Sequence, residues 1–177
     1  SERAQLAGAI NTLKFEADGR IFGDNTDGTG LVHDLVHNFG INLKNKNILV
    51  MGAGGAVRGV LGPLLKQHPA MVMLVNRTVN KARDLAGEFS SHGTVEACGF
   101  DELRGKHYDI VINGTAASLK GEVPPLPETL FARGALAFAD LHRLLHAQET
   151  LGRILRDDAG ALQQVHEAGR RAIEYRH

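Results

Sequence analysis

The sequence lacks a second cysteine, a surplus of charge of either sign and any long apolar run. Cys98 stands alone, which excludes an internal disulfide and is typical of a reducing compartment. Twenty basic residues balance twenty acidic ones, so the chain has none of the positive surplus expected of a nucleic-acid-binding protein. No apolar stretch approaches the roughly 20 residues of a membrane helix, and we expect no signal peptide. These absences predict a cytoplasmic protein that binds neither nucleic acid nor membrane.

What the chain does contain is the composition of an ordinary α/β protein. Hydrophobic residues make up 43% of its 177 residues, charged residues make up 23%, and 21 residues are glycine. This length is sufficient for one full hydrophobic core.

A strand, a glycine turn, a helix and a second strand follow one another in the middle of the chain. Residues 48–51 are apolar, residues 52–56 read Gly-Ala-Gly-Gly-Ala, and apolar residues recur at helical spacing over 57–65. The helix is expected to stop at His68-Pro69, and residues 71–75 form a second apolar run. This order predicts a βαβ unit whose glycine turn would hold a pyrophosphate.

The residues of the glycine turn suit phosphate binding for separate reasons. Gly52 permits a sharp turn out of the strand, and Gly54 lets the backbone approach a phosphate. The N–H groups from Gly54 to Ala56 open a helix whose positive end favours anions. Val57 stands at the third glycine position of the nucleotide-binding pattern, where we expect it to crowd the helix against the strand. A purely structural glycine turn is the alternative interpretation.

The end of the second strand indicates which nucleotide would bind. Enzymes that prefer NAD usually carry Asp or Glu there, to hydrogen-bond the ribose 2′-hydroxyl. Here the residues are Asn76, Arg77 and Thr78, with Lys81 one turn further on. A guanidinium binds a 2′-phosphate bidentately, and Thr78 is expected to cap the next helix. NADP is therefore the predicted cofactor, and a surface arginine beside a capping threonine is the alternative.

Alternating strands and helices predict an α/β, Rossmann-like, doubly wound parallel sheet. Further strands are expected at 94–98, 108–112 and 134–139, with a helix over 79–89 and a helical turn at 100–103. Asn113 and Thr115 follow a strand directly, at the sheet edge where ligands of such folds bind. The expected organisation is a remnant strand and hairpin of a substrate-domain cleft over 1–27, the NADP-binding Rossmann part over 28–140, and a helical C-terminal tail over 141–177.

The first residues of the chain do not resemble the beginning of a domain. Residues 1–6 could end a helix, and residues 8–15 predict a strand that returns through an Asp18-Gly19 turn. A helix is expected over 29–39.

Two pairs of histidines raise the question of a metal site. The pair His33 and His37 and the pair His142 and His146 each lie four residues apart. Both pairs are more consistent with solvated helix faces, so no metal is predicted.

Five motifs together resemble the shikimate dehydrogenase family in order and spacing. They are Gly8-Ala9-Ile10-Asn11-Thr12-Leu13, Gly23-Asp24-Asn25-Thr26-Asp27-Gly28, Gly52-Ala53-Gly54-Gly55-Ala56, Asn76-Arg77-Thr78 and Asn113-Gly114-Thr115. The resemblance covers roughly residues 5 to 138. It implies a two-domain enzyme that reduces 3-dehydroshikimate to shikimate with NADPH, with the substrate held in a cleft.

The resemblance also implies roles for individual residues. Asn11 would bind a substrate hydroxyl, and Asp27 would bind substrate as the Asp of the family's catalytic Lys–Asp pair. Asn113 and Thr115 would line the nicotinamide side. The remaining cofactor contacts would be Gly52, Ala53, Gly54, Gly55, Ala56, Asn76, Arg77, Thr78 and Lys81.

Two departures from the family pattern keep alternatives open. The family's N-terminal substrate domain with its catalytic Lys is not found in this sequence, since neither Lys14 nor Lys120 lies in the expected motif. The resemblance also fades after Ala139, and the helical tail could mediate homo-oligomer formation. The alternatives are a non-catalytic NADP-binding module or truncated pseudoenzyme, a quinate/shikimate dehydrogenase-like paralogue, and the nucleotide domain of a glutamyl-tRNA reductase. Asn11 and Asp27 together argue against the last of these.

Overall fold

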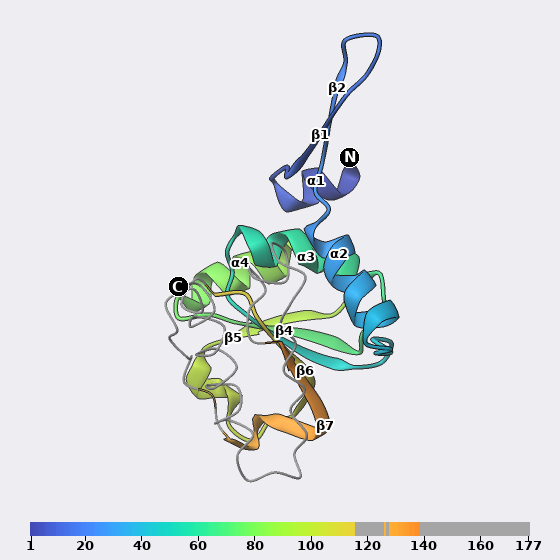
Figure 1. Cartoon of the computed structure of the whole chain (residues 1–177). Coiled ribbons are helices and arrows are strands. Elements are labelled where there is room, and N and C mark those ends of the chain that lie inside the picture. The colour runs from blue at the N-terminus through green and yellow to red at the C-terminus, as the bar shows by residue number, and fades with distance from the viewer. Residues whose placement is uncertain (116–125, 127, 139–177) are drawn as a thin grey trace, which may run out of the picture.

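The computed structural model of the protein describes residues 1–115, 126 and 128–138 (Figure 1). The expected helical tail over 141–177, Lys120 and the pair His142 and His146 lie outside the described residues.

A parallel sheet of five strands forms the centre of the molecule. Its strands lie in the order β5-β4-β3-β6-β7, and every neighbouring pair is parallel. The strands are β3 (Asn47–Met51), β4 (Met71–Val75), β5 (Val95–Cys98), β6 (Tyr108–Asn113) and β7 (Phe131–Phe138). The chain enters the sheet in the middle, proceeds to one edge, returns and proceeds to the other. This order is that of a doubly wound Rossmann-like sheet, as predicted.

Three helices cover one face of the sheet, as Figure 1 shows: α2 (Asp27–His33), α3 (Gly55–Leu65) and α4 (Val79–Phe89). The side chains of Ile48 and Val50 point into the core under these helices, whereas Leu49 and Met51 join the core on the opposite face. A parallel strand is buried on both faces, which explains why β3 is a continuous apolar run rather than an alternating one. The opposite core also includes side chains from two short 3₁₀ helices, η2 (Phe100–Leu103) and η4 (Glu128–Leu130).

Val57 is a core residue. Its side chain is 0% exposed and packs in the same cluster as Val50 and Leu61. Val57 therefore fills space between α3 and the sheet, at the position where we expected it to crowd the helix against the strand.

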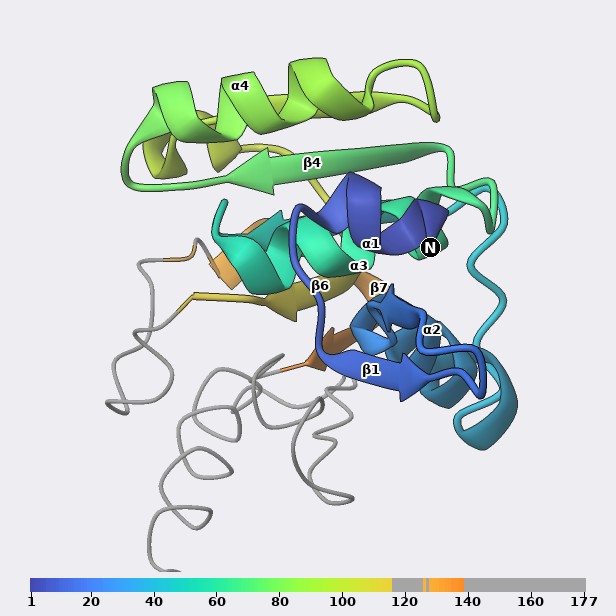
Figure 2. The same cartoon turned by 90° about the horizontal axis from the view of Figure 1, so that it is seen from above.

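The N-terminal segment projects away from the sheet. Helix α1 (Glu2–Ala7) lies beside α3, and the strands β1 (Thr12–Phe15) and β2 (Ile21–Asp24) form an antiparallel hairpin beyond it (Figures 1 and 2). The predicted strand over 8–15 is shorter in the structure because Gly8, at φ +62°, ends α1 in the left-handed conformation. Large apolar side chains of the hairpin remain exposed, among them Leu13, Phe15 and Ile21 at 52%, 72% and 62%.

Other element boundaries also differ from those expected. The helix predicted over 29–39 begins at Asp27 and continues as the π-helical turn η1 (Asp34–Asn38). Strand β7 begins at Phe131 rather than at residue 134, because Gly134 adopts φ +75° within an irregular stretch of the strand. In this position the glycine marks a bulge rather than the start of a strand.

None of the helices among the described residues combines the length and the apolar character needed to cross a membrane.

The burial of Val57 predicts its contribution to stability. We expect Val57→Ala to lower the free energy of unfolding by about 2 kcal/mol, because two buried methyl groups are lost and a cavity remains. Chemical denaturation followed by circular dichroism measures the loss. Val79→Ala, at a partly buried position, is the matched control and should cost less. An equal loss in both variants would contradict the core role of Val57.

Candidate functional site

The glycine turn after β3 brings two strand ends into close contact. Gly52 has φ +108°, and its N–H donates to the Val75 carbonyl at 2.8 Å. A Cβ atom at this position would lie 3.0 Å from the Gly114 carbonyl oxygen. Because Gly114 follows β6, a side chain at position 52 would push the ends of β3 and β6 apart. A glycine is therefore required at position 52 for two reasons: the positive φ angle, and the short distance to the Gly114 carbonyl.

The other two glycines of the turn face open space. Apart from its own neighbours in the chain, a Cβ built at Gly54 or at Gly55 would have no atom within 4 Å. Gly54 is the N-cap residue of α3, and no side chain caps this helix. The N–H groups of the first helical turn have no acceptor within the helix, and they lie at its positive end. The surface over these glycines thus offers backbone donors and room for an anion.

The residues after β4 present positive charge close to this turn. Arg77 and Thr78 are exposed, and the Asn76 side-chain amide donates to the Thr78 carbonyl at 3.0 Å. Thr78 is the N-cap residue of α4, but its side chain makes no cap hydrogen bond, in contrast to the expectation. Within the described part of the chain, neither Arg77 nor Lys81 forms an ion pair. The Thr78 hydroxyl and both cations therefore remain available to a ligand.

Asn113 and Thr115 form a small structured unit at the end of β6. Asn113 is 6% exposed, and its Oδ1 accepts hydrogen bonds from the Thr115 N–H at 3.0 Å and from the Thr115 hydroxyl at 2.8 Å. Since β6 and β4 both pair with β3, residues 52–56, 76–78 and 113–115 meet at one edge of the sheet. The structure thus brings the predicted cofactor residues together at the carboxyl ends of three adjacent strands.

Asn11 and Asp27 form a second group, on the N-terminal side. The Asn11 side-chain amide donates to Asp27 Oδ1 at 2.5 Å, and Asn11 Oδ1 accepts from the Thr26 N–H at 3.0 Å. The Asn11 N–H also donates to the Asp24 carbonyl at 3.0 Å, which continues the ladder of the hairpin. The hairpin therefore joins two residues that lie 16 positions apart in the sequence.

Sequence reasoning missed the ion pair that attaches α1 to the hairpin. Arg3 Nε donates to Asp24 Oδ1 at 2.7 Å, and Arg3 Nη1 donates to the Thr29 hydroxyl at 2.9 Å. The Arg3 guanidinium, and next the Ser1 hydroxyl, hold the pKa of the Asp24 carboxyl well below its usual range. An arginine and an aspartate 21 residues apart carry no periodic signal, so only the fold reveals their contact.

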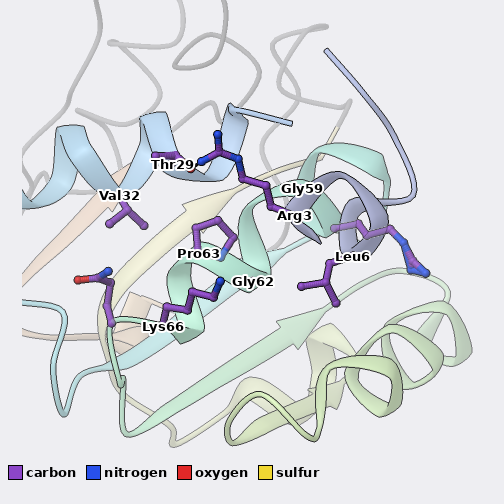
Figure 3. A pocket seen from close by; sticks show the side chains of 10 residues that line it. Arg3, Leu6, Thr29, Val32, Gly59, Gly62, Pro63 and Lys66 are labelled. Carbon is purple, nitrogen blue, oxygen red and sulfur yellow. Dashed lines mark hydrogen bonds between the residues drawn. The ribbon is translucent and has the colours of Figure 1, made fainter. Parts of the chain in front are cut away.

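A pocket of about 230 Å³ lies between α1, α2 and α3, away from the glycine turn (Figure 3). Its lining includes the cations Arg3, Arg58 and Lys66. Arg3 is paired with Asp24, and Arg58 is paired with Glu88 of α4. Lys66 has no carboxylate partner within the described part of the chain. Because most of its charge is neutralised, the pocket does not by itself define an anion site.

The exposed pair His33 and His37 lies on the segment formed by α2 and η1, with ring centroids 4.7 Å apart. Among residues 1–115, 126 and 128–138, no group of three or more His, Cys, Asp or Glu side chains could hold a metal ion.

Comparison with protein families and curated proteins finds shikimate dehydrogenases. The family model described as "Shikimate / quinate 5-dehydrogenase" matches residues 34–120. The shikimate dehydrogenase (NADP(+)) of Cellvibrio japonicus (strain Ueda107) is 57% identical over 136 residues, which cover 77% of this chain and 49% of that protein. That of Hahella chejuensis (strain KCTC 2396) is 51% identical over 144 residues, which cover 81% and 53%. The chain thus spans about half the length of the curated relatives it matches.

Solved structures include a shikimate dehydrogenase among those similar to this chain. The shikimate 5-dehydrogenase of Thermus thermophilus in complex with shikimate is 30% identical, with a TM-score of 0.66 over 98% of this chain and 71% of that chain. The Ael1 enzyme of Pseudomonas putida is 36% identical, with a TM-score of 0.73 over 99% of this chain and 65% of that chain.

The Arg3–Asp24 pair predicts a pH dependence of stability. Because the pKa of Asp24 is lower in the folded chain than in the unfolded one, its contribution is complete at neutral pH and is lost as the pH falls below about 4. Urea unfolding of wild type and Asp24→Asn should therefore show a clear difference in stability at pH 7 that shrinks at pH 3. The control is Asp18→Asn, which removes a more exposed pair with Arg20. An Asp24→Asn difference that is independent of pH would contradict the assignment.

Proposed function

The chain belongs to the shikimate dehydrogenase family, and on this premise we propose that it is the NADP-binding portion of an enzyme that reduces 3-dehydroshikimate to shikimate with NADPH. The observation that carries the proposal is the meeting of the glycine turn, Arg77 and Asn113 at one sheet edge. The relatives named above for NADP(+) and shikimate support both the cofactor and the substrate. The single Cys98 favours a reducing compartment, so we assign the protein to the cytoplasm.

The residues at the sheet edge fit the parts of NADP. The open backbone at Gly54 and Gly55 leaves space that a Cβ would otherwise fill, and the N–H groups at the start of α3 suit a pyrophosphate. Arg77 and Lys81, with the Thr78 hydroxyl, suit a 2′-phosphate that a carboxylate would repel.

The chemistry of the reaction divides between cofactor and protein. NADPH, when bound, supplies the hydride that reduces the substrate ketone. Asn11 and Asp27, already joined by a hydrogen bond, would bind a substrate hydroxyl and fix its orientation. The developing alkoxide needs a proton donor and a stabilising partner. In this family the catalytic Lys–Asp pair serves this purpose, and Asp27 would be the Asp of that pair.

The N-terminal hairpin supports the assignment of residues 1–27 to a substrate domain. Leu13, Phe15 and Ile21 lie on the same face of β1 and β2, because Phe15 pairs with Ile21 and strand side chains alternate. All three residues are more than half exposed. A two-stranded hairpin with such a face requires a further surface to pack on. We propose that the rest of the substrate domain supplies it.

A non-catalytic NADP-binding module is the second candidate. Neither Lys14 nor Lys120 lies in a stretch that matches the family's lysine motif, so neither residue is assigned the role of that lysine. The description of the matching family includes quinate as well as shikimate, so a quinate-preferring paralogue also remains open. Whether the tail over 141–177 forms an oligomer stays a prediction.

The arrangement around Arg77 predicts cofactor preference. We expect NADPH to bind at least tenfold more tightly than NADH, which corresponds to about 1.4 kcal/mol. Arg77→Ala should remove most of this preference and leave the affinity for NADH nearly unchanged. Isothermal titration calorimetry with both nucleotides measures the effect, with Arg83→Ala on the exposed side of α4 as the matched control. Equal affinities of the wild type for the two nucleotides would refute the 2′-phosphate assignment.

The turnover of the chain fused to a substrate domain separates the two candidates. Holding cofactor and substrate face to face contributes up to about 7–11 kcal/mol in favourable cases, and this chain supplies only part of the substrate wall. We expect NADPH binding with negligible oxidation of shikimate by the isolated chain. Fusion of a relative's N-terminal domain ahead of Ser1 should restore a measurable rate, and Asp27→Asn in the fusion should remove it. A fusion that binds shikimate and NADPH but remains inactive would favour the non-catalytic module.

A further inference from the structure

Asn25 lies in the short connection between β2 and α2, and its side chain joins the start of α2 to the segment before β1. It is 4% exposed, one of two buried polar residues among the described residues. Its Oδ1 accepts a hydrogen bond from the Asp27 N–H at 3.2 Å, and its Nδ2 donates to the Ala9 carbonyl at 3.3 Å. A single amide thus holds the backbone of Asp27 against the segment that carries Asn11.

Helices α2 and α3 approach so closely that no side chain fits between them at Gly28. A Cβ atom there would lie 2.6 Å from the Gly59 carbonyl oxygen and 2.7 Å from Pro63 Cγ. Residue 63 is the fourth after Gly59, and a proline has no N–H to donate to that carbonyl. The Gly59 carbonyl is therefore left without its helical donor at the point where Gly28 packs against it.

Gly59 also supports the side chains of Asn25 and Asp27. A Cβ atom at Gly59 would lie 3.3 Å from Asn25 Oδ1, 3.5 Å from Asn25 Nδ2 and 3.7 Å from Asp27 Oδ2. The amide and the carboxylate thus rest on the bare backbone of α3, about one turn after the helix begins at Gly55. Figure 3 shows Gly59 and Pro63 on α3, facing the helix that carries Thr29.

We propose that Asn25 is a positioning residue for Asp27 and that Gly59 is the surface against which it is held. The helix whose first turn faces the cofactor pyrophosphate therefore also sets the place of the catalytic carboxylate. This inference rests on the proposed function for the role of Asp27, but the contact itself needs no cofactor. It predicts that a side chain at Gly59 would displace Asn25 by a few tenths of an ångström, and Asp27 with it.

Gly62 provides a matched control for Gly59. Both glycines lie inside α3, but a Cβ at Gly62 would make only ordinary contacts, 3.6 Å from Leu6 and 3.9 Å from Phe89. Both substitutions to alanine raise helix propensity by the same amount, since the residues exchanged are identical. A difference between Gly59→Ala and Gly62→Ala therefore reports on the contact with Asn25 and Asp27.

The first experiment is NMR spectroscopy of the cofactor-free 177-residue chain. Gly59→Ala should change the signals of the Asp27 N–H and of the Asn11 side-chain amide, because Asn25 is displaced and the Asn11–Asp27 hydrogen bond with it. Gly62→Ala should leave both signals in place. Asn25→Ala should reproduce the effect without a change in α3, which keeps the test decisive if Gly59→Ala unfolds the chain. Unchanged Asp27 and Asn11 signals in Asn25→Ala would overturn the proposal.

The second experiment adds NADP⁺ and then measures activity. The NMR signals of residues 54–56 should respond to NADP⁺ equally in Gly59→Ala and Gly62→Ala. If they respond in neither variant, the proposed cofactor site is refuted, while the first experiment still decides the inference about Asn25. In the fused two-domain enzyme, Gly59→Ala should lower kcat about tenfold, since displacement of a reacting group by a fraction of an ångström slows the reaction strongly. The Kd for NADPH should stay within about twofold of wild type. A loss of kcat that is equal in Gly62→Ala would overturn the positioning role.

Discussion

The close approach of α2 and α3 is the constraint on which the position of the N-terminal segment and of Asp27 depends. Gly28 lies against the backbone of Gly59 and Val60, at distances that no side chain could occupy. Helix packing normally keeps axes apart by the thickness of the interdigitating side chains, and glycines at a crossing remove that spacing. Here the result is that the segment carrying Asn25, Asp27 and Gly28 is held directly against the backbone of α3.

The same absence of side chains recurs at the carboxyl edge of the sheet. Gly52 lets β3 and β6 end close together, and Gly54 and Gly55 leave the start of α3 uncovered. Around this bare backbone, the side chains of Asn76 and Asn113 hold nearby loop residues in place. The candidate site is therefore built largely of backbone, and Arg77 and Lys81 are exposed beside it.

Much of this fold can be predicted from the sequence, because continuous apolar runs bounded by turns specify buried parallel strands. The boundaries of α4 and β4 coincide with those expected. Strand β7 begins earlier than expected because the pattern makes Gly134 a strand boundary, whereas it takes a left-handed conformation within the strand. Thr78 does not make the expected capping hydrogen bond. The sequence identifies Thr78 as the cap residue, but it does not determine the orientation of its side chain.

The contacts that position Asp27 are harder to predict than the strands. Hydrogen bonds between loops, such as that from Asn11 to Asp27, have no periodicity, so only the family resemblance points to these two residues. The sequence does not indicate the role of Gly59. A glycine inside a helical pattern lowers the helix propensity, but the pattern does not show which residues pack against it.

The exposed hairpin has a consequence for the handling of the chain in solution. Its two strands each leave one edge of backbone donors and acceptors unpaired among the described residues, beside the apolar side chains of Phe15 and Ile21. Strand edges of this kind pair with their own copies, and charged residues are the usual protection. Lys14 and Arg20 supply such charges, but each is already neutralised by a neighbouring carboxylate. Self-association through β1 and β2 is thus the intrinsic hazard of this chain in isolation, and its solubility should be limited by the hairpin and not by the sheet.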